Sequence, residues 1–128
     1  MLDINRPEIL AEVHAVFQRY ETALLQNDVQ VLEELFWNSP HTIRYGAGEN
    51  LHGWQAISDF RRARRTGPFC RRLDNTVITT FGDQFATANT EYWRDGVDCL
   101  GRESKTFVRM TDGWRIVAAH VSLIGETL

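Results

Sequence analysis

An arginine in a short strand-forming run is the residue most suggestive of chemistry in this sequence. Arg44 lies within residues 42–46 (TIRYG), and a glycine-rich turn follows at once. Because side chains alternate across a strand, Arg44 shares a face with Thr42 and Gly46. On an inner face, the permanently charged guanidinium fork would bind a carboxylate. On an outer face it would only be solvated, and periodicity alone leaves both interpretations open.

Two more polar residues fall on apolar stripes and complete the candidate catalytic set with Arg44. Tyr20 lies on the apolar face of a predicted first helix, where a buried hydroxyl needs a partner such as Arg44 or a ligand. His120 shares a strand face with Trp114 and Ile116, which predicts that it lines the core wall. It is then either a hydrogen-bonded structural histidine or a pocket acid or base.

Three further residues are candidates for substrate binding, namely Tyr45, Glu91 and Ser122. Ser122 alternates onto the predicted face of His120, but no nucleophile-elbow glycines surround it, so a catalytic triad is not indicated. Glu91 is a possible base or arginine partner, and a surface or dimer-interface salt bridge is the alternative. No two histidines stand at a metal-ligand spacing, and phosphate-binding glycine patterns are absent from the sequence. We therefore expect no metal and no cofactor.

The composition is that of one soluble globular domain over residues 1–128. Hydrophobic residues make up 43% of the chain and charged residues 24%. The sequence has no apolar run of membrane-spanning length and no signal-peptide pattern, so we expect a cytoplasmic protein without membrane contact. Cys70 and Cys99 fit this compartment as reduced, buried thiols.

The charge of the chain is unevenly distributed. Its net charge of −3 argues against nucleic-acid binding. Thirteen of the fourteen basic residues are arginine, and six of them fall within residues 61–72. This cluster is either an anion-attracting patch or a solvated helix face and strand start that pair with acids.

The elements that must position these residues are helices followed by a run of strands. Apolar residues at helical spacing predict a first helix to about residue 25, a second after Asp28, and a third from Trp54 with Arg61 or Arg64 on its apolar side. Period-two patterns predict long strands over 69–81, 85–94, 100–110 and 114–124. Short turns between them require antiparallel pairing. The fold class is α+β, with N-terminal helices packed on a curved antiparallel sheet that leaves a cone-shaped cavity.

Three segments carry a resemblance to a known family: residues 42–51, 76–82 and 113–122. Together they resemble the HpxZ-like proteins linked to oxalurate catabolism. That group includes the amidohydrolase of cyanuric-acid breakdown, which deaminates a carboxylated urea. It belongs to the NTF2-like (SnoaL-like) superfamily of cystatin-like α+β folds. The resemblance covers nearly the whole chain.

The resemblance implies a cone-shaped barrel with a deep pocket and a homodimer formed sheet to sheet. It also implies that Tyr20 and Arg44 lie at the reacting amide. One departure concerns the third long strand, where the family pattern is Ser-Gln-Thr-Trp and this chain has SKTF at 104–107. Lys105 alternates away from Ser104 and Thr106, which predicts a position outside the pocket.

The resulting hypothesis is a cofactor-independent amidohydrolase. Its substrate would be a small carboxylated urea or oxalurate-type compound, cleaved at a C–N amide bond in purine, oxalurate or related nitrogen catabolism. Two alternatives stay open: a non-catalytic ligand-binding partner of an amidase, and an NTF2-like isomerase or dehydratase. The last acts on apolar rings, for which a charged Arg44 in the cavity is a poor match.

Overall fold

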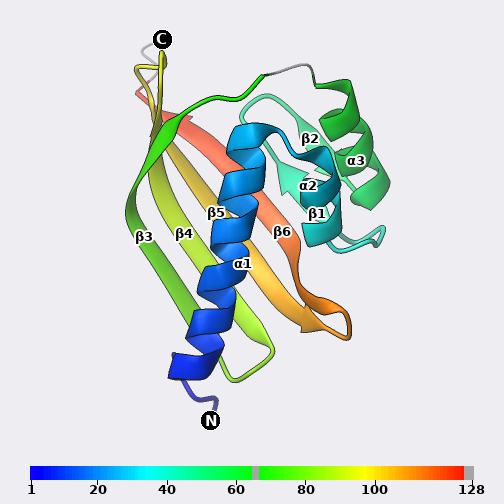
Figure 1. Cartoon of the computed structure of the whole chain (residues 1–128), viewed down its shortest axis with the longest axis vertical. Helices are drawn as coiled ribbons and strands as arrows, with labels where there is room; N and C mark the ends of the chain where they lie inside the picture. The colour runs from blue at the N-terminus through cyan, green and yellow to red at the C-terminus, as the bar shows by residue number, and fades with distance from the viewer. Residues whose placement is uncertain (65–66, 126–128) are drawn as a thin grey trace.

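The computed structural model describes residues 1–64 and 67–125, which form a helical layer on one sheet (Figure 1). The described elements are α1 (Pro7–Gln26), α2 (Val29–Leu35), β1 (Ile43–Tyr45), β2 (Asn50–His52), α3 (Trp54–Ala63), β3 (Arg71–Phe81), β4 (Phe85–Arg94), β5 (Leu100–Met110) and β6 (Gly113–Ile124). The α+β class and the order of helices and strands agree with the sequence prediction.

The strands form a six-stranded sheet in the order β2-β1-β6-β5-β4-β3. The four long strands pair antiparallel with their chain neighbours, as their short turns predict. The short β1 joins β6 in parallel, with Arg44 opposite Ala119. This pairing places Arg44 beside the last strand of the chain, although more than seventy residues separate the two in sequence.

The concave side of the sheet is covered by α1, which runs diagonally across it (Figure 1). Val13 and Phe17 are buried on the helix, and Ala86 and Ala88 are buried on β4. Small side chains on the strand let the helix pack closely, so burial of this apolar stripe fixes the position of Tyr20 one turn further on. Beyond α1, the Asp28 side chain accepts a hydrogen bond from the Val31 amide and caps α2.

The other two helices close one end of the sheet, beside β1 and β2 (Figure 1). Leu32 and Leu35 of α2 and Ile57 of α3 are buried. The Trp54 indole Nε1 donates to the backbone oxygen of Glu33 over 2.9 Å. This contact ties the start of α3 to α2, so the polar residues of α3 are held at a fixed place over the sheet.

A β-bulge in the last hairpin places His120 and Ser122 on the opposite face from the predicted one. The β5–β6 register shifts between Thr106 and Phe107, which lie opposite Ala118 and Ile116 respectively. One extra residue on β6 inverts the facing of all residues beyond it. Ile116 still faces the core, but Ala119 is the next buried position and His120 is exposed. His120 and Ser122 therefore lie on the convex side, so their predicted place on the core wall is wrong.

The prediction for Lys105 is also wrong. Lys105 is only 3% exposed and lies on the concave side of β5, with Glu103 and Phe107. The alternation with Ser104 is as expected, but the two faces are assigned the wrong way round. A charged pair on a core face is uncommon, and this pair is tolerated because its charges neutralise each other.

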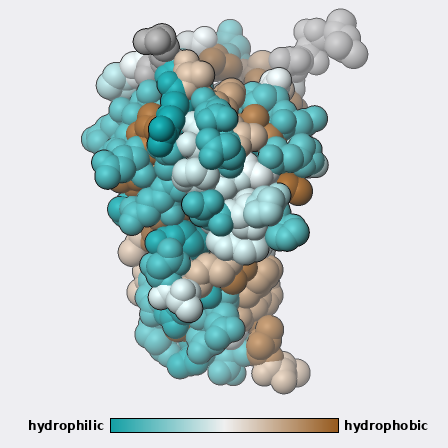
Figure 2. Space-filling view, turned by 90° about the vertical axis from the view of Figure 1, so that its right-hand side faces the viewer, coloured by the Kyte–Doolittle hydropathy of each residue, from teal (hydrophilic) through white to brown (hydrophobic). Residues whose placement is uncertain are grey.

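The face of the molecule seen in Figure 2 is mainly hydrophilic, and apolar residues form small separate patches on it. Cys70 and Cys99 are both free thiols, but Cys70 is exposed, contrary to the expectation of burial, because it precedes β3 in an extended segment. None of the described helices is long and apolar enough to cross a membrane.

Candidate functional site

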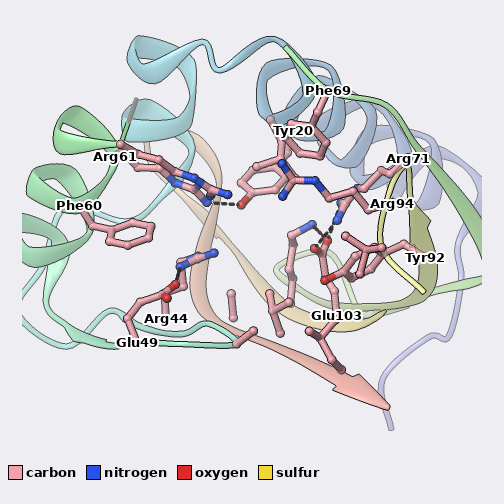
Figure 3. A pocket seen from close by; sticks show the side chains of 18 residues that line it. Tyr20, Arg44, Glu49, Phe60, Arg61, Phe69, Arg71, Tyr92, Arg94 and Glu103 are labelled. Carbon is pink, nitrogen blue, oxygen red and sulfur yellow. Dashed lines mark hydrogen bonds and ion pairs between the residues drawn. The ribbon is translucent and has the colours of Figure 1, made fainter. Parts of the chain in front are cut away.

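A cavity of about 310 Å³ lies between the helices and the concave side of the sheet (Figure 3). Side chains reach it from α1, β1, the β1–β2 turn, α3, the four long strands and the segments that follow α3 and β4. It is lined by Tyr20, Leu24, Arg44, Ala47, Glu49, Phe60, Arg61, Arg64, Phe69, Arg71, Tyr92, Arg94, Val97, Glu103, Lys105, Ala119, Val121 and Leu123. Six of these residues are cationic and two are acidic. This size suits a small ligand, and the excess of positive charge favours an anion.

Arg44 points into the cavity, so the inner-face interpretation is confirmed. Arg44 is 7% exposed. Its Nη1 donates to Oε1 of Glu49 over 2.6 Å, and its guanidinium lies 5.4 Å from the centre of the Phe60 ring. Thr42, on the same face, is fully buried and donates to the backbone oxygen of Trp37. Thr42 thus anchors the strand on the N-terminal side of Arg44.

Tyr20 and Arg61 meet across the cavity (Figure 3). Arg61 Nη2 donates to the Tyr20 hydroxyl oxygen over 3.0 Å, and both residues are buried. Burial alone would raise the pKa of Tyr20, but the positive charges of Arg61, Lys105 and Arg44 outweigh it and hold this pKa below its ordinary value. Tyr20 is therefore a phenol whose ionised form is stabilised by its surroundings.

The floor of the cavity is a buried network of alternating charges. Arg71 donates to Glu21 over 2.6 Å and to Glu103 over 3.2 Å, while Lys105 also pairs with Glu103. Burial opposes ionisation of Glu103, but Lys105 and Arg71 lower its pKa to about 2. The two carboxylates in turn raise the pKa of Arg71. Glu103 and Arg71 are therefore held charged, and the ion pairs tie α1, β3 and β5 together beneath the cavity.

Two arginines further along the lining have no acidic partner among the described residues. Arg64 lies 5.9 Å from the Phe60 ring and Arg94 lies 4.0 Å from the Phe69 ring. Burial and the neighbouring positive charges of Arg94 and Arg44 lower the pKa of Arg64. Unpaired cations held on aromatic faces add to the attraction of the cavity for anions.

The basic cluster at residues 61–72 therefore has two parts. Arg61 is buried in the site, and the side chain of Arg71 is 4% exposed there. Arg62 and Arg72 are exposed and pair with Glu33 and Asp74. Both interpretations from the sequence thus hold for part of the cluster. Arg65 lies outside the described residues.

Four of the six predicted site residues lie away from the cavity. His120 and Ser122 face the convex side, as does Glu91, which accepts a hydrogen bond from Asn75 over 3.1 Å. The Tyr45 ring packs edge-on against the rings of His52 and His120, each at 5.7 Å between centres. Tyr20 and Arg44 are the two candidates that the structure brings together at the cavity.

Glu49, Arg61, Arg71, Glu103 and Lys105 were not singled out as site residues from the sequence. For Glu103 and Lys105 one signal is the alternation with Gly101 and Phe107, since a buried aromatic at the end of this series marks the whole face as inner. Among the described residues, no cluster of three or more histidine, cysteine or acidic side chains is arranged to hold a metal ion.

A profile of the AtzH-like family matches residues 2–127. The chain belongs to the AtzH-like family. No curated protein matches it. A crystal structure from Pectobacterium atrosepticum, described as a protein of unknown function, is 54% identical to this AtzH-like protein, with 96% of each chain covered and a TM-score of 0.93. A cystatin-like fold protein from Burkholderia xenovorans is 46% identical over 99% of this chain and 100% of its own, with a TM-score of 0.94.

More distant structures support the fold alone. An NTF2-like superfamily protein from Salmonella enterica is 23% identical over 94% of each chain, with a TM-score of 0.77. The AtzH-like protein therefore has the NTF2-like, cystatin-like fold predicted from its sequence. The narrower resemblance to HpxZ-like proteins stays a prediction.

Proposed function

We propose that this AtzH-like protein is a cytoplasmic, cofactor-independent amidohydrolase. Its substrate is a small carboxylated urea or oxalurate-type compound of nitrogen catabolism, as in the HpxZ-like proteins that its sequence resembles. The observation that carries the proposal is the placement of Arg44 and Tyr20 in one cation-rich cavity. Arg44 supplies a guanidinium fork that binds a carboxylate, and Tyr20 supplies a hydroxyl whose pKa is lowered.

Arg44 binds the substrate. Its guanidinium matches a carboxylate or amide oxygen through parallel hydrogen bonds, each contributing about 1.5–3 kcal/mol because the donor is charged. The ligand must displace Glu49, which pairs with Arg44 in the free protein. The cavity of about 310 Å³ lies at the small end of the range for ligand pockets, which suits a planar compound of a few heavy atoms.

Tyr20 transfers the proton that the leaving nitrogen needs. Water adds to the carbonyl carbon, and the developing negative charge on oxygen lies among the cations of the cavity, which stabilise it. As the C–N bond breaks, the leaving nitrogen receives a proton through the Tyr20 hydroxyl. Amide and water thus give carboxylate and amine, with no covalent enzyme intermediate.

Two other functions would use the same cavity. A non-catalytic subunit would hold the carboxylated compound for a partner amidase, with Arg44 as the clamp. An isomerase would abstract a proton from an apolar ring and would need a base beside apolar walls. Glu103 is the buried carboxylate of the cavity, and its low pKa and two cationic partners make it a weak base.

The test is turnover by the purified protein. Ammonia release from carboxylated ureas and oxalurate is measured for the parent chain, Arg44→Ala and Tyr20→Phe, with Glu91→Gln on the convex face as the control. We expect activity in the parent and control, and loss of about a hundredfold or more in the other two. Full activity in both cavity variants would overturn the assigned roles. Binding without turnover would indicate the partner subunit, and ketone isomerisation without ammonia release would indicate the isomerase.

We further propose that two copies of the chain form a homodimer through the convex face of the sheet, as the family resemblance implies. Val77, Phe85 and Trp93 expose apolar side chains on this face. Association would remove them from water, which is the usual driving force for such an interface.

A further inference from the structure

Arg61 differs from the other buried cations of the cavity. Arg71 and Lys105 each pair with at least one carboxylate, and Arg44 pairs with Glu49. Arg61 is 1% exposed, and no carboxylate among the described residues pairs with it. The hydrogen bond that its side chain makes goes to the Tyr20 hydroxyl, while its Nε has no hydrogen-bond partner in the described part of the chain.

A buried guanidinium without a counter-ion is costly, and it cannot shed its proton at physiological pH. The anion nearest at hand is the ionised form of Tyr20, whose oxygen lies 3.0 Å from Arg61 Nη2. A phenolate would accept this hydrogen bond as a charge-assisted one, which is shorter and stronger than the bond to a neutral phenol. Arg61 therefore favours the phenolate.

Taken together, the other charged groups around Tyr20 also favour the phenolate. The Lys105 ammonium lies 4.0 Å from the centre of the Tyr20 ring. Glu103 opposes ionisation of Tyr20 but is already neutralised by Lys105 and Arg71. The titratable and charged groups that line the cavity with Tyr20 are Arg44 on β1, Glu49 in the β1–β2 turn, Arg61 and Arg64 at α3, Arg71 on β3, Tyr92 and Arg94 on β4, and Glu103 and Lys105 on β5. Glu21 on α1, next to Tyr20 in sequence, pairs with Arg71.

We propose that Arg61 is a positioning residue that holds Tyr20 as a phenolate, so that Tyr20 enters the reaction as a base. This inference rests on the proposed function for its catalytic part, but the ionic pair itself does not depend on turnover. In the cycle, the phenolate takes a proton from water while the water oxygen bonds to the carbonyl carbon. Tyr20 then gives that proton to the leaving nitrogen as the C–N bond breaks, and the phenolate is restored.

The experiment is an ultraviolet titration of tyrosinate in the purified full chain. The chain has three tyrosines, so the spectrum of Tyr20→Phe is subtracted from that of the parent to isolate Tyr20. Arg61→Met removes the charge and keeps much of the volume, whereas Arg61→Lys keeps the charge. Arg62→Met is the matched control, because Arg62 is the neighbouring arginine of α3 but is exposed and pairs with Glu33.

We expect Tyr20 to ionise at a lower pH than a free phenol. Arg61→Met should move this ionisation upward by about one pH unit or more, a tenfold change in the constant. Arg61→Lys should move it less, and Arg62→Met should leave it in place. Where turnover is measurable, the acid limb of kcat/KM should move upward with the same variants, because a base must be deprotonated to act.

The outcomes separate this inference from the proposed function. A shifted Tyr20 titration in a protein without amide turnover would keep the ionic pair and overturn only the hydrolase. A Tyr20 titration at the value of a free phenol, or one that Arg61→Met leaves in place, would overturn the role of Arg61. If Arg61→Met does not fold, the parent and Arg61→Lys titrations decide, since an ordinary phenol value in the parent is sufficient to reject the proposal.

Discussion

The Glu49 carboxylate forms a salt bridge with the guanidinium of Arg44, with 2.6 Å between Oε1 and Nη1. Glu49 is held directly over Gly46, since a Cβ on that glycine would lie 1.9 Å from Oε1. The side chain of Glu49 is 27% exposed, whereas that of Arg44 is 9% exposed. An acid that the protein itself supplies thus sits where a ligand carboxylate would bind, and it lies on a turn at the edge of the sheet.

Neutralising Glu49 should therefore strengthen anion binding. In Glu49→Gln, a ligand carboxylate no longer competes with an internal one. We expect its affinity to rise about two- to fivefold, because a partly exposed charge pair contributes up to about 1 kcal/mol. Calorimetric titration with oxalurate measures this directly. Glu91→Gln removes a carboxylate from the convex face and should change nothing. Weaker or unchanged binding in Glu49→Gln would show that Glu49 does not compete for Arg44.

The pH dependence of the free energy of unfolding should reflect the titration of Glu103 in the floor of the cavity. The pKa of Glu103 lies at about 2 in the folded chain, below its ordinary value of 4.5. A lowered pKa stabilises the fold above the unfolded value and loses this contribution as the pH falls through the folded one. We expect the free energy of unfolding to fall between about pH 5 and pH 2, by on the order of 3 kcal/mol from this group.

Denaturant unfolding across this pH range measures the effect, with Glu103→Gln as the test variant. This variant should be less stable at neutral pH, because Arg71 and Lys105 lose a buried partner. Its stability should also depend less steeply on pH between these limits. Equal slopes for parent and variant would mean that Glu103 does not titrate with unfolding.

Much of the site could be predicted because it lies on regular elements. Arg44 alternates with Ile43 and Tyr45 on a strand, and Tyr20 follows the helical stripe of Val13 and Phe17. The helical period places Tyr20 on the buried face. For Arg44 alternation leaves both faces open, and the family resemblance favours the inner one. Their partners come from segments far apart in sequence, and neither period nor composition states which cation will meet the Tyr20 hydroxyl.

The residues that were misplaced share one physical cause, which is that inner and outer faces cannot be assigned from alternation alone. At β6 a bulge inverts the facing between Ile116 and His120. At β5 the buried face carries Glu103 and Lys105, two residue types that are rarely buried. Charges buried in mutual contact leave little trace in a sequence, because each looks like a solvated residue until its partner is known.

A glycine on β5 gives a test of the cavity wall. A Cβ on Gly101 would lie 2.0 Å from the Tyr92 ring, and this ring packs against the Arg71 guanidinium at 4.5 Å. Gly101→Ala should therefore displace Tyr92 and cost about 1–3 kcal/mol of stability through overpacking. Gly48→Ala is the control, since nothing lies within 4 Å of its added Cβ. Equal unfolding midpoints for the two variants would mean that Tyr92 moves aside without cost.

The proposed homodimer makes a prediction for the far side of the sheet. Trp93 and Phe85 are 37% and 40% exposed on the convex face, and a charge placed among such apolar contacts must be desolvated when two copies meet. Trp93→Glu should weaken association at least about tenfold, as measured by sedimentation over a range of concentrations. Gln18→Glu adds the same charge on the exposed side of α1 and should leave association unchanged. A parent chain that sediments as a monomer throughout, or a Trp93→Glu variant that dimerises as the parent does, would reject the convex face as the interface.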